Sequence, residues 1–259
     1  MKTKSIFKNK FKYYLKGVGY TYLLTLAVMF VLPVVFALLF TGSLRGVSIH
    51  NLLKNNLLPF ISILFLLISS YRVYKPFKFY IQNGISRRTV WKATIGVVGL
   101  CSLLMSLINY GYYYAIVVPV TGIVNNTFYS QLFGQFLGFH NFWNGPAQIV
   151  YEWLLLWSFA VIAMFFGSLS ALFKKRTRLI IWLTIFIGVV VIIRFLMQFH
   201  TGMNLDWMES VVKFVAGYTK TDGEGMWNPF HPIGTMAVGI IIGTGINYWI
   251  QQKIVLKNQ

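Results

Sequence analysis

The sequence predicts an all-α integral membrane protein with six transmembrane helices. Hydrophobic residues make up 57% of the chain and charged residues only 11%, whereas soluble domains carry about a quarter charged residues. The apolar residues fall in runs of about 20, the length that a helix needs to cross the hydrocarbon core of a bilayer. Basic residues border these runs. The composition therefore excludes a large soluble core and favours a single membrane domain over residues 1–259.

Six apolar segments are the candidates for these transmembrane helices. The first three lie within the N-terminal half of the chain, and the other three lie within the C-terminal half. No soluble domain and no internal repeat is recognisable between them. The predicted spans cover residues 18–41, 57–74, 93–119, 147–173, 179–199 and 233–250.

The charge distribution orients the predicted spans. Of the 23 Lys and Arg residues, 18 fall in the segments that would share one side with the N-terminus, and all five acidic residues fall elsewhere. Cytoplasmic segments carry the excess of Lys and Arg in membrane proteins. We therefore expect both termini in the cytoplasm of a bacterial plasma membrane. Because the cations border the spans, anionic lipids are more suitable partners for them than nucleic acid.

The first 17 residues predict an interfacial amphipathic helix that leads into the first span. Aromatic and aliphatic residues recur there at helical spacing, beside a stripe of four lysines. A frayed cationic tail is the alternative. The apolar residues are Phe7, Phe11, Tyr14, Leu15 and Val18, and the lysines are Lys4, Lys8, Lys12 and Lys16.

A short basic stretch separates the second and third spans. Pro76 suits the first turn of a helix, and Asn83 with Gly84 supplies a C-terminal stop. Ser86 can then cap the helix that continues into the third span. We predict a short helix at the cytoplasmic face, joined to two membrane helices. A basic connection bound to lipid headgroups would account for the same residues.

This stretch, FKFYIQNGISRR (77–88), carries a family resemblance. Together with the Lys-rich N-terminus and six spans with both ends inside, it resembles the membrane subunits of type-2 ATP-binding cassette exporters. In that family a short cytoplasmic helix, the coupling helix, docks into a cleft of the ATPase subunit. The resemblance implies this role for Phe77, Phe79, Tyr80, Asn83, Gly84, Ser86, Arg87 and Arg88.

The resemblance also implies partners and a function. The chain contains no G-x-x-x-x-G-K-[ST] loop, so ATP and Mg would be bound by a separate ATPase subunit, and we expect neither catalytic residues nor a cofactor in this chain. A second membrane subunit, the same chain or a homologue, would complete the transporter. The expected function is export of a hydrophobic or amphipathic substrate, such as a peptide, a lipid-like molecule or a drug.

Other function classes make different demands on the sequence. A secondary transporter should place charged groups near the middle of its spans, and an intramembrane enzyme needs a nucleophile and a base at one depth. The four histidines are scattered without nearby ligands, so no metal site is expected. A secondary transporter and an ATP-independent membrane immunity or regulatory protein are the alternatives to the exporter.

Two outer segments are expected to lie at the membrane interface. In the first, Asn204 can cap a helix that carries Asp206 and Glu209 and ends at Gly217, an interfacial or re-entrant helix before the last span. The second, residues 127–143, is rich in aromatic residues and forms either another interfacial helix or part of an aromatic belt.

Glu152 and Arg194 are the two charged residues inside the predicted spans, apart from Arg72 at the edge of the second. Each lies about five residues below the outer end of its span, so their depths match. We predict an intramembrane ion pair between them. Separate snorkelling of each side chain to the interface, or a contact with substrate, would also fit.

Two further sets of residues have expected roles inside the membrane. Thr235, Gly239 and Gly243 repeat at four-residue spacing, which lets another helix approach closely, either within the subunit or at a dimer interface. The outer half of the third span is amphiphilic enough to line a transport pathway, although aromatic-belt residues would look the same. Its candidate pathway residues are Asn109, Tyr110 and Tyr113.

Overall fold

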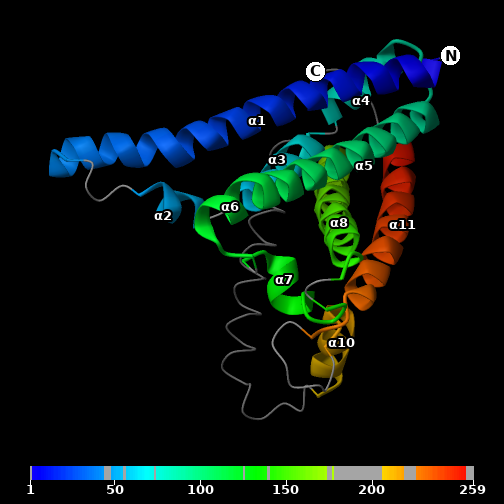
Figure 1. Cartoon of the computed structure of the whole chain (residues 1–259). Coiled ribbons are helices and arrows are strands. Elements are labelled where there is room, and N and C mark those ends of the chain that lie inside the picture. The colour runs from blue at the N-terminus through cyan, green and yellow to red at the C-terminus, as the bar shows by residue number, and fades with distance from the viewer. Residues whose placement is uncertain are drawn as a thin grey trace.

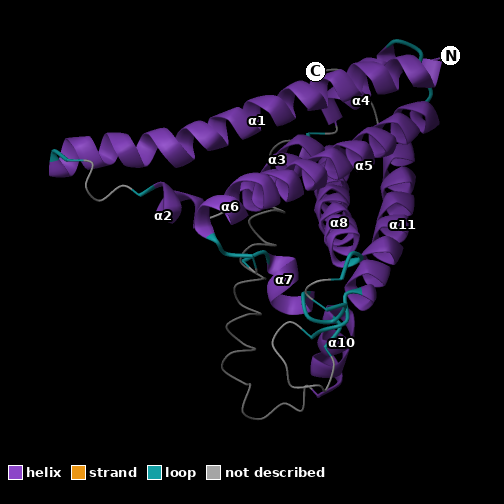
Figure 2. Ribbon diagram, in the orientation of Figure 1, coloured by secondary structure: helices purple, strands orange, loops and turns teal. Residues whose placement is uncertain are grey.

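The computed structural model describes residues 2–43, 48–54, 57–72, 74–124, 126–138, 141–173, 177, 206–218 and 226–254. All regular secondary structure in these ranges is helical (Figure 2), which confirms the all-α class. In chain order the elements are α1 (Lys2–Thr41), α2 (Ile49–Lys54), α3 (Leu58–Tyr71), α4 (Tyr74–Gln82), α5 (Arg87–Tyr112), the π-helical turn η1 (Tyr113–Val117), α6 (Val118–Thr121), α7 (Phe128–Phe133), α8 (Asn144–Leu172), α10 (Asp206–Ala216) and α11 (Phe230–Lys253).

Four helical segments of the described chain are long and apolar enough to cross a membrane. They are Thr3–Phe40, Arg87–Thr121, Asn144–Leu172 and Phe230–Lys253. A fifth arises if α3 and α4 are taken together as one span bent by 41°. These helices are compatible with a multi-pass membrane protein, while the predicted span at 179–199 lies outside the described residues.

The second predicted span is shorter than expected. Helix α3 has 14 residues, which is less than the roughly 20 that a membrane crossing requires. It ends at Tyr71, and the chain then bends before the basic helix α4 begins at Tyr74. The predicted boundary between an apolar and a basic helix is therefore present, but the apolar part is about a turn shorter than residues 57–74.

Helix α1 joins the predicted N-terminal helix and the first span without a break. The four lysines of the stripe are all exposed, as their spacing predicted. On the opposite face Val18 is buried, Phe7, Phe11 and Tyr14 are half-buried and Leu15 is exposed, so part of this face packs on protein. There the Phe7 ring lies 3.2 Å from the position that a Cβ of Gly96 would take, and the Phe65 ring lies 2.9 Å from the corresponding position at Gly17.

Helices α1, α3, α5 and α8 surround a common apolar core. Each of the four contributes buried residues to it, and α11 packs along the outer side of α8 through a separate group of apolar side chains that includes Ile240 and Val161. Burial of these side chains contributes about 1.5–3 kcal/mol each in water, and close van der Waals packing takes over that role where lipid replaces water. The common core consists of Val18, Leu66, Val98, Met105, Leu156, Ala160 and Met164.

Two glycines of different helices allow backbones to approach closely. At Gly167 of α8 a Cβ would overlap the carbonyl oxygen of Tyr71, so α3 lies directly against this helix. At Gly243 of α11 a Cβ would lie 2.6 Å from Cγ1 of Val161. Gly243 thus packs within the subunit, which is one of the two arrangements that the spacing allowed, whereas Gly239 has no described atom within 4 Å of its Cβ position. Thr235 is half-buried and donates to the carbonyl of Pro232.

Several helix ends gather at one end of the bundle, which we call the α4 end. Figure 1 shows the start of α1, α4, the start of α5 and the end of α11 together there. Buried Phe77 of α4 confirms this grouping, because it packs against residues of α5, α8 and the segment after α11. The predicted cytoplasmic ends of the described helices therefore share one side of the molecule.

Short helices lie at the opposite end. The capping box of Thr127 and Ser130 begins α7, and Phe133 of this helix is buried against Tyr151 of α8. Helix α10 ends at Gly217, whose φ of 78° requires the left-handed region, as the sequence predicted. On its exposed face the hydrogen bond from Lys213 lowers the pKa of the Glu209 carboxyl. Its proposed cap, Asn204, lies outside the described residues.

Replacement of Gly167 should separate α3 from α8. We expect Gly167→Ala to lower the free energy of unfolding by about 1–3 kcal/mol, because its Cβ meets backbone, which cannot rotate away. Thermal unfolding of the purified protein in detergent measures the change as a fall in Tm. Gly239→Ala is the matched control and should leave Tm unchanged or raise it slightly, since that position is open and Ala favours a helix.

The orientation in the membrane can be tested with single cysteines in a Cys101→Ala background. Cysteines at Lys75 and Lys253 should be shielded from an impermeant thiol reagent outside intact cells. Cysteines at Ile49 and Phe142 should react, because these exposed positions belong to the opposite end. Labelling of the first pair from outside would reverse the predicted orientation.

Candidate functional site

The turn after α4 folds as the sequence predicted. Gly84 adopts a positive φ of 72°, and the N–H of Ile85 donates to the carbonyl of Tyr80, which closes the helix. The side chain of Asn83 donates to the carbonyl of Phe79 at 2.7 Å. Ser86 then accepts from the N–H of Thr89 at 3.3 Å and begins α5. These local hydrogen bonds define the turn between α4 and α5 and so fix the direction of α4 relative to α5.

The eight residues with an expected coupling role divide into two groups. Three contact the chain itself: Phe77 is fully buried, Tyr80 lies under the Lys10 ammonium at 5.3 Å, and Arg87 donates to backbone carbonyls of α11. The other five are accessible. Phe79 has 62% of its surface exposed, and Asn83, Gly84, Ser86 and Arg88 are exposed as well.

A second candidate site is a polar cluster inside the helix bundle. It consists of Tyr22 of α1, Ser62 of α3, Asn109 of α5 and Glu152 of α8, one residue from each helix of the core. Asn109 and Ser62 are buried, with 2% and 1% of their surfaces exposed. The cluster therefore joins four helices through hydrogen bonds between polar side chains, which the surrounding apolar residues could not provide.

Asn109 is the centre of this cluster. Its Nδ2 donates to Oε1 of Glu152 at 2.5 Å and to Oγ of Ser62 at 3.2 Å, while its Oδ1 accepts from the Tyr22 hydroxyl at 2.7 Å. The amide nitrogen thus faces Glu152 and the amide oxygen faces Tyr22, an orientation in which the carboxyl group of Glu152 accepts and the Tyr22 hydroxyl donates. Ser62 uses its own proton toward the carbonyl of Leu58 at 2.8 Å. The donors of the cluster are therefore all paired.

The structure describes only one member of the predicted ion pair. Glu152 is partly buried and bonded to Asn109, while Arg194 lies outside the described residues, so their pairing stays a prediction. The structure adds a partner for Glu152 that the sequence did not indicate, since the amide of Asn109 offers it a hydrogen bond within the bundle.

The two tyrosines among the candidate pathway residues pack against neighbouring side chains and backbone. The hydroxyl of Tyr113 donates to the carbonyl of Ile123 at 3.0 Å, and this side chain is buried. The Tyr110 ring contacts that of Tyr114 in a tilted arrangement, with 4.6 Å between ring centroids. The π turn brings these rings together: the N–H of Val118 bonds to the carbonyl of Tyr113, five residues earlier. Asn109 alone of the three candidates joins the polar cluster.

Sequence reasoning missed Tyr22, Ser62 and Gly167. Tyr22 and Ser62 are single polar residues in apolar segments, and a polar residue within a span is a signal of hydrogen bonding between helices. Gly167 lies four residues after Ala163 and four before Ala171, the small-residue spacing that was noted only in the last span. These signals were present, but neither identifies the partner helix.

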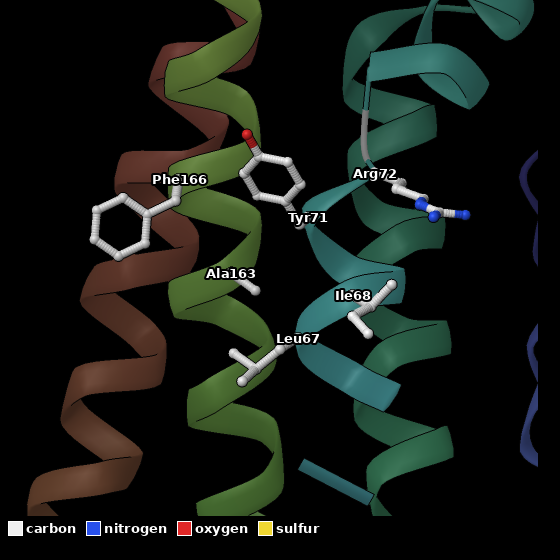
Figure 3. Close-up of a pocket in the computed structure, with 6 residues that line it drawn as sticks. All are labelled: Leu67, Ile68, Tyr71, Arg72, Ala163 and Phe166. Atoms are coloured by element: carbon white, nitrogen blue, oxygen red, sulfur yellow. The ribbon is translucent and has the colours of Figure 1, made fainter. Parts of the chain in front are cut away.

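An open groove lies between α3 and α8 at the α4 end (Figure 3). In this view Leu67 and Tyr71 lie toward α8, while Arg72 points away from it. The Tyr71 hydroxyl lies 3.1 Å from Oγ of Ser170. The lining is largely apolar and offers one cation at its edge, so it has no cluster of polar groups that would define a ligand.

Within the described ranges no group of three or more His, Cys, Asp or Glu side chains could hold a metal ion. Comparison with protein-family models, curated proteins and solved structures finds no match. The functional interpretation therefore depends on α4 and on the polar cluster themselves.

The polar cluster can be tested by removing its central amide. Asn109→Leu leaves Tyr22, Ser62 and Glu152 without their shared partner, and each buried unpaired polar group costs about 1–3 kcal/mol. We expect a marked fall in Tm in detergent. Glu152→Gln should cost less, because its amide oxygen can still accept from Asn109.

Tyr20→Phe is the matched control, since this hydroxyl lies on the exposed face of α1. It should leave Tm unchanged, whereas Tyr22→Phe should lower it. Equal Tm values for Asn109→Leu and the wild type would contradict a stabilising role of the cluster.

Proposed function

We propose that this chain is the permease subunit of an ATP-binding cassette exporter. A separate ATPase subunit binds ATP and Mg, and a second membrane subunit, the same chain or a homologue, completes the transporter. The substrate is hydrophobic or amphipathic, such as a peptide, a lipid-like molecule or a drug. The proposal extends the resemblance of the 77–88 segment.

The observation that carries the proposal is the two-sided character of α4. Its inward face packs through Phe77 into a buried cluster, and its outward face leaves Phe79 exposed beside polar and basic residues. An exposed aromatic side chain on a polar helix is the kind of residue that fills a pocket on a partner. A buried contact on the opposite face allows a displacement of α4 to move the spans.

Glu152 favours a second candidate, proton-linked secondary transport. A carboxyl group inside a helix bundle is a common element of proton relays, and here it is bonded to three other helices through Asn109. This candidate needs no ATPase. Uptake or export that is driven by a pH gradient in vesicles with this chain alone, and lost in Glu152→Gln, would favour it over the exporter.

The exporter predicts a stable complex with an ATPase. We expect the full-length chain, purified from its own membranes, to bring with it a subunit that carries a G-x-x-x-x-G-K-[ST] loop and hydrolyses ATP. Phe79→Asp should abolish the stimulation of this hydrolysis by substrate while the chain remains inserted, because the side chain is exposed and the core is untouched.

Phe142→Asp is the matched control, an exposed phenylalanine in the segment before α8. It should keep the stimulation. A chain that carries no such ATPase, or a Phe79→Asp variant with wild-type stimulation, would contradict the assignment of α4 as the coupling helix.

A further inference from the structure

The last turn of α11 is closed by a side chain from α5. The final four carbonyls of a helix lack partners within the helix. In α11, which ends at Lys253, Nη1 of Arg87 donates to the carbonyl of Gln251 at 3.1 Å and also to the carbonyl of Gln252. A guanidinium at this place satisfies two orphan acceptors and interacts favourably with the negative end of the helix dipole.

The residue that follows α11 completes the same junction. Ile254 is fully buried, and it packs with Phe77 of α4, Val90 of α5 and Ala171 of α8. The Arg87 guanidinium lies 5.9 Å from the centre of the Phe77 ring. Phe77 is therefore enclosed by Val90, Ala171 and Ile254, and we call this buried site the socket. The residue after the last span, Ile254, forms one of its walls.

A second pair of contacts lies earlier in α11, before its last turn. Nε1 of Trp91 donates to the carbonyl of Thr244 at 3.2 Å, and its ring lies 5.0 Å from that of Tyr248. The first turns of α5 thus contact α11 at two levels. The start of α5 and the end of α11 therefore pack together as one unit, and α4 packs against this unit through Phe77.

We propose that Arg87 and Ile254 are positioning residues that fix α4 to the C-terminal end of α11. A displacement of α4 then moves the last span, α11, directly. It also moves α3 and α5, to which α4 is joined in the chain. Arg87 acts inside the subunit instead of contacting a partner. The consequence for ATP coupling rests on the proposed function, but the junction itself does not.

The junction can be tested with a cysteine reporter at Val90, which is buried with 2% of its surface exposed. The reporter is Val90→Cys in a full-length Cys101→Ala chain, and the probe is N-ethylmaleimide. Arg87→Gln removes the cap of α11, and Ile254→Asn places a polar amide in the socket. Loss of a charged hydrogen bond or of apolar burial of this size should increase the labelling rate about tenfold.

Two controls separate the junction from general loosening. Lys253→Gln removes a cation of the same helix end whose Nζ lies over the Trp249 ring, outside the socket. Ile254→Val keeps an apolar side chain in the socket. Both should label at the rate of the unmodified reporter. Unchanged labelling in Arg87→Gln and Ile254→Asn, or an equal increase in Lys253→Gln, would overturn the proposal.

The same variants separate this proposal from the transport function. The labelling requires no ATPase, so its failure rejects the junction and leaves the exporter proposal standing. In a complex with the ATPase, Ile254→Asn should reduce substrate-stimulated ATP hydrolysis about tenfold, whereas Ile254→Val should keep the wild-type stimulation. Faster labelling of the Ile254→Asn reporter with full stimulation would reject the role of this junction in coupling.

Discussion

A polar side chain that enters an apolar helix bundle must find a hydrogen-bond partner there, because neither lipid nor apolar side chains can supply one. Asn109 meets this constraint by bonding to residues of three other helices. Its amide requires α1, α3 and α8 to present Tyr22, Ser62 and Glu152 at one level. The relative heights of these helices are therefore specified by one side chain, and the apolar core packs around that arrangement.

The α4 end is governed by the same need at the level of the backbone. The last turn of α11 exposes carbonyl groups that its own helix cannot satisfy, and Arg87 of α5 supplies donors to them. This contact places the end of α11 next to α4, where Ile254 packs against Phe77. Asn109 lies 22 residues beyond Arg87 on the same helix, about 33 Å away, so α5 connects the two hydrogen-bonded junctions.

Both junctions bear on the two proposed functions. Helix α4 offers an exposed aromatic residue on one face and a buried one on the other, so a force applied outside can act on the bundle. The polar cluster lies within the bundle, where a carboxyl group is costly unless it is bonded. In an exporter the cluster would hold the spans together as α4 moves, whereas in a proton-linked transporter Glu152 would itself be the working group.

Local patterns account for much of what the sequence predicted correctly. The basic turn at 77–88, the cap at Ser86, the stop at Gly84 and the end of α10 at Gly217 depend on preferences of a few adjacent residues. Helix boundaries in α8 and α11 followed from apolar runs of sufficient length. The continuous α1 was harder to predict, because a lysine stripe looks alike on a membrane surface and on a helix packed against protein.

Composition, apolar run length and turn chemistry by themselves determined the all-helical class, the apolar helices of membrane-spanning length and the place of α4, since these features depend on residues near one another in the chain. Only the tertiary structure decided that Asn109 bonds Tyr22, Ser62 and Glu152, that Gly167 admits α3, and that Arg87 caps α11. The physical reason is that a hydrogen-bonding group requires a partner and a small residue permits close packing, but neither specifies which distant helix provides the contact.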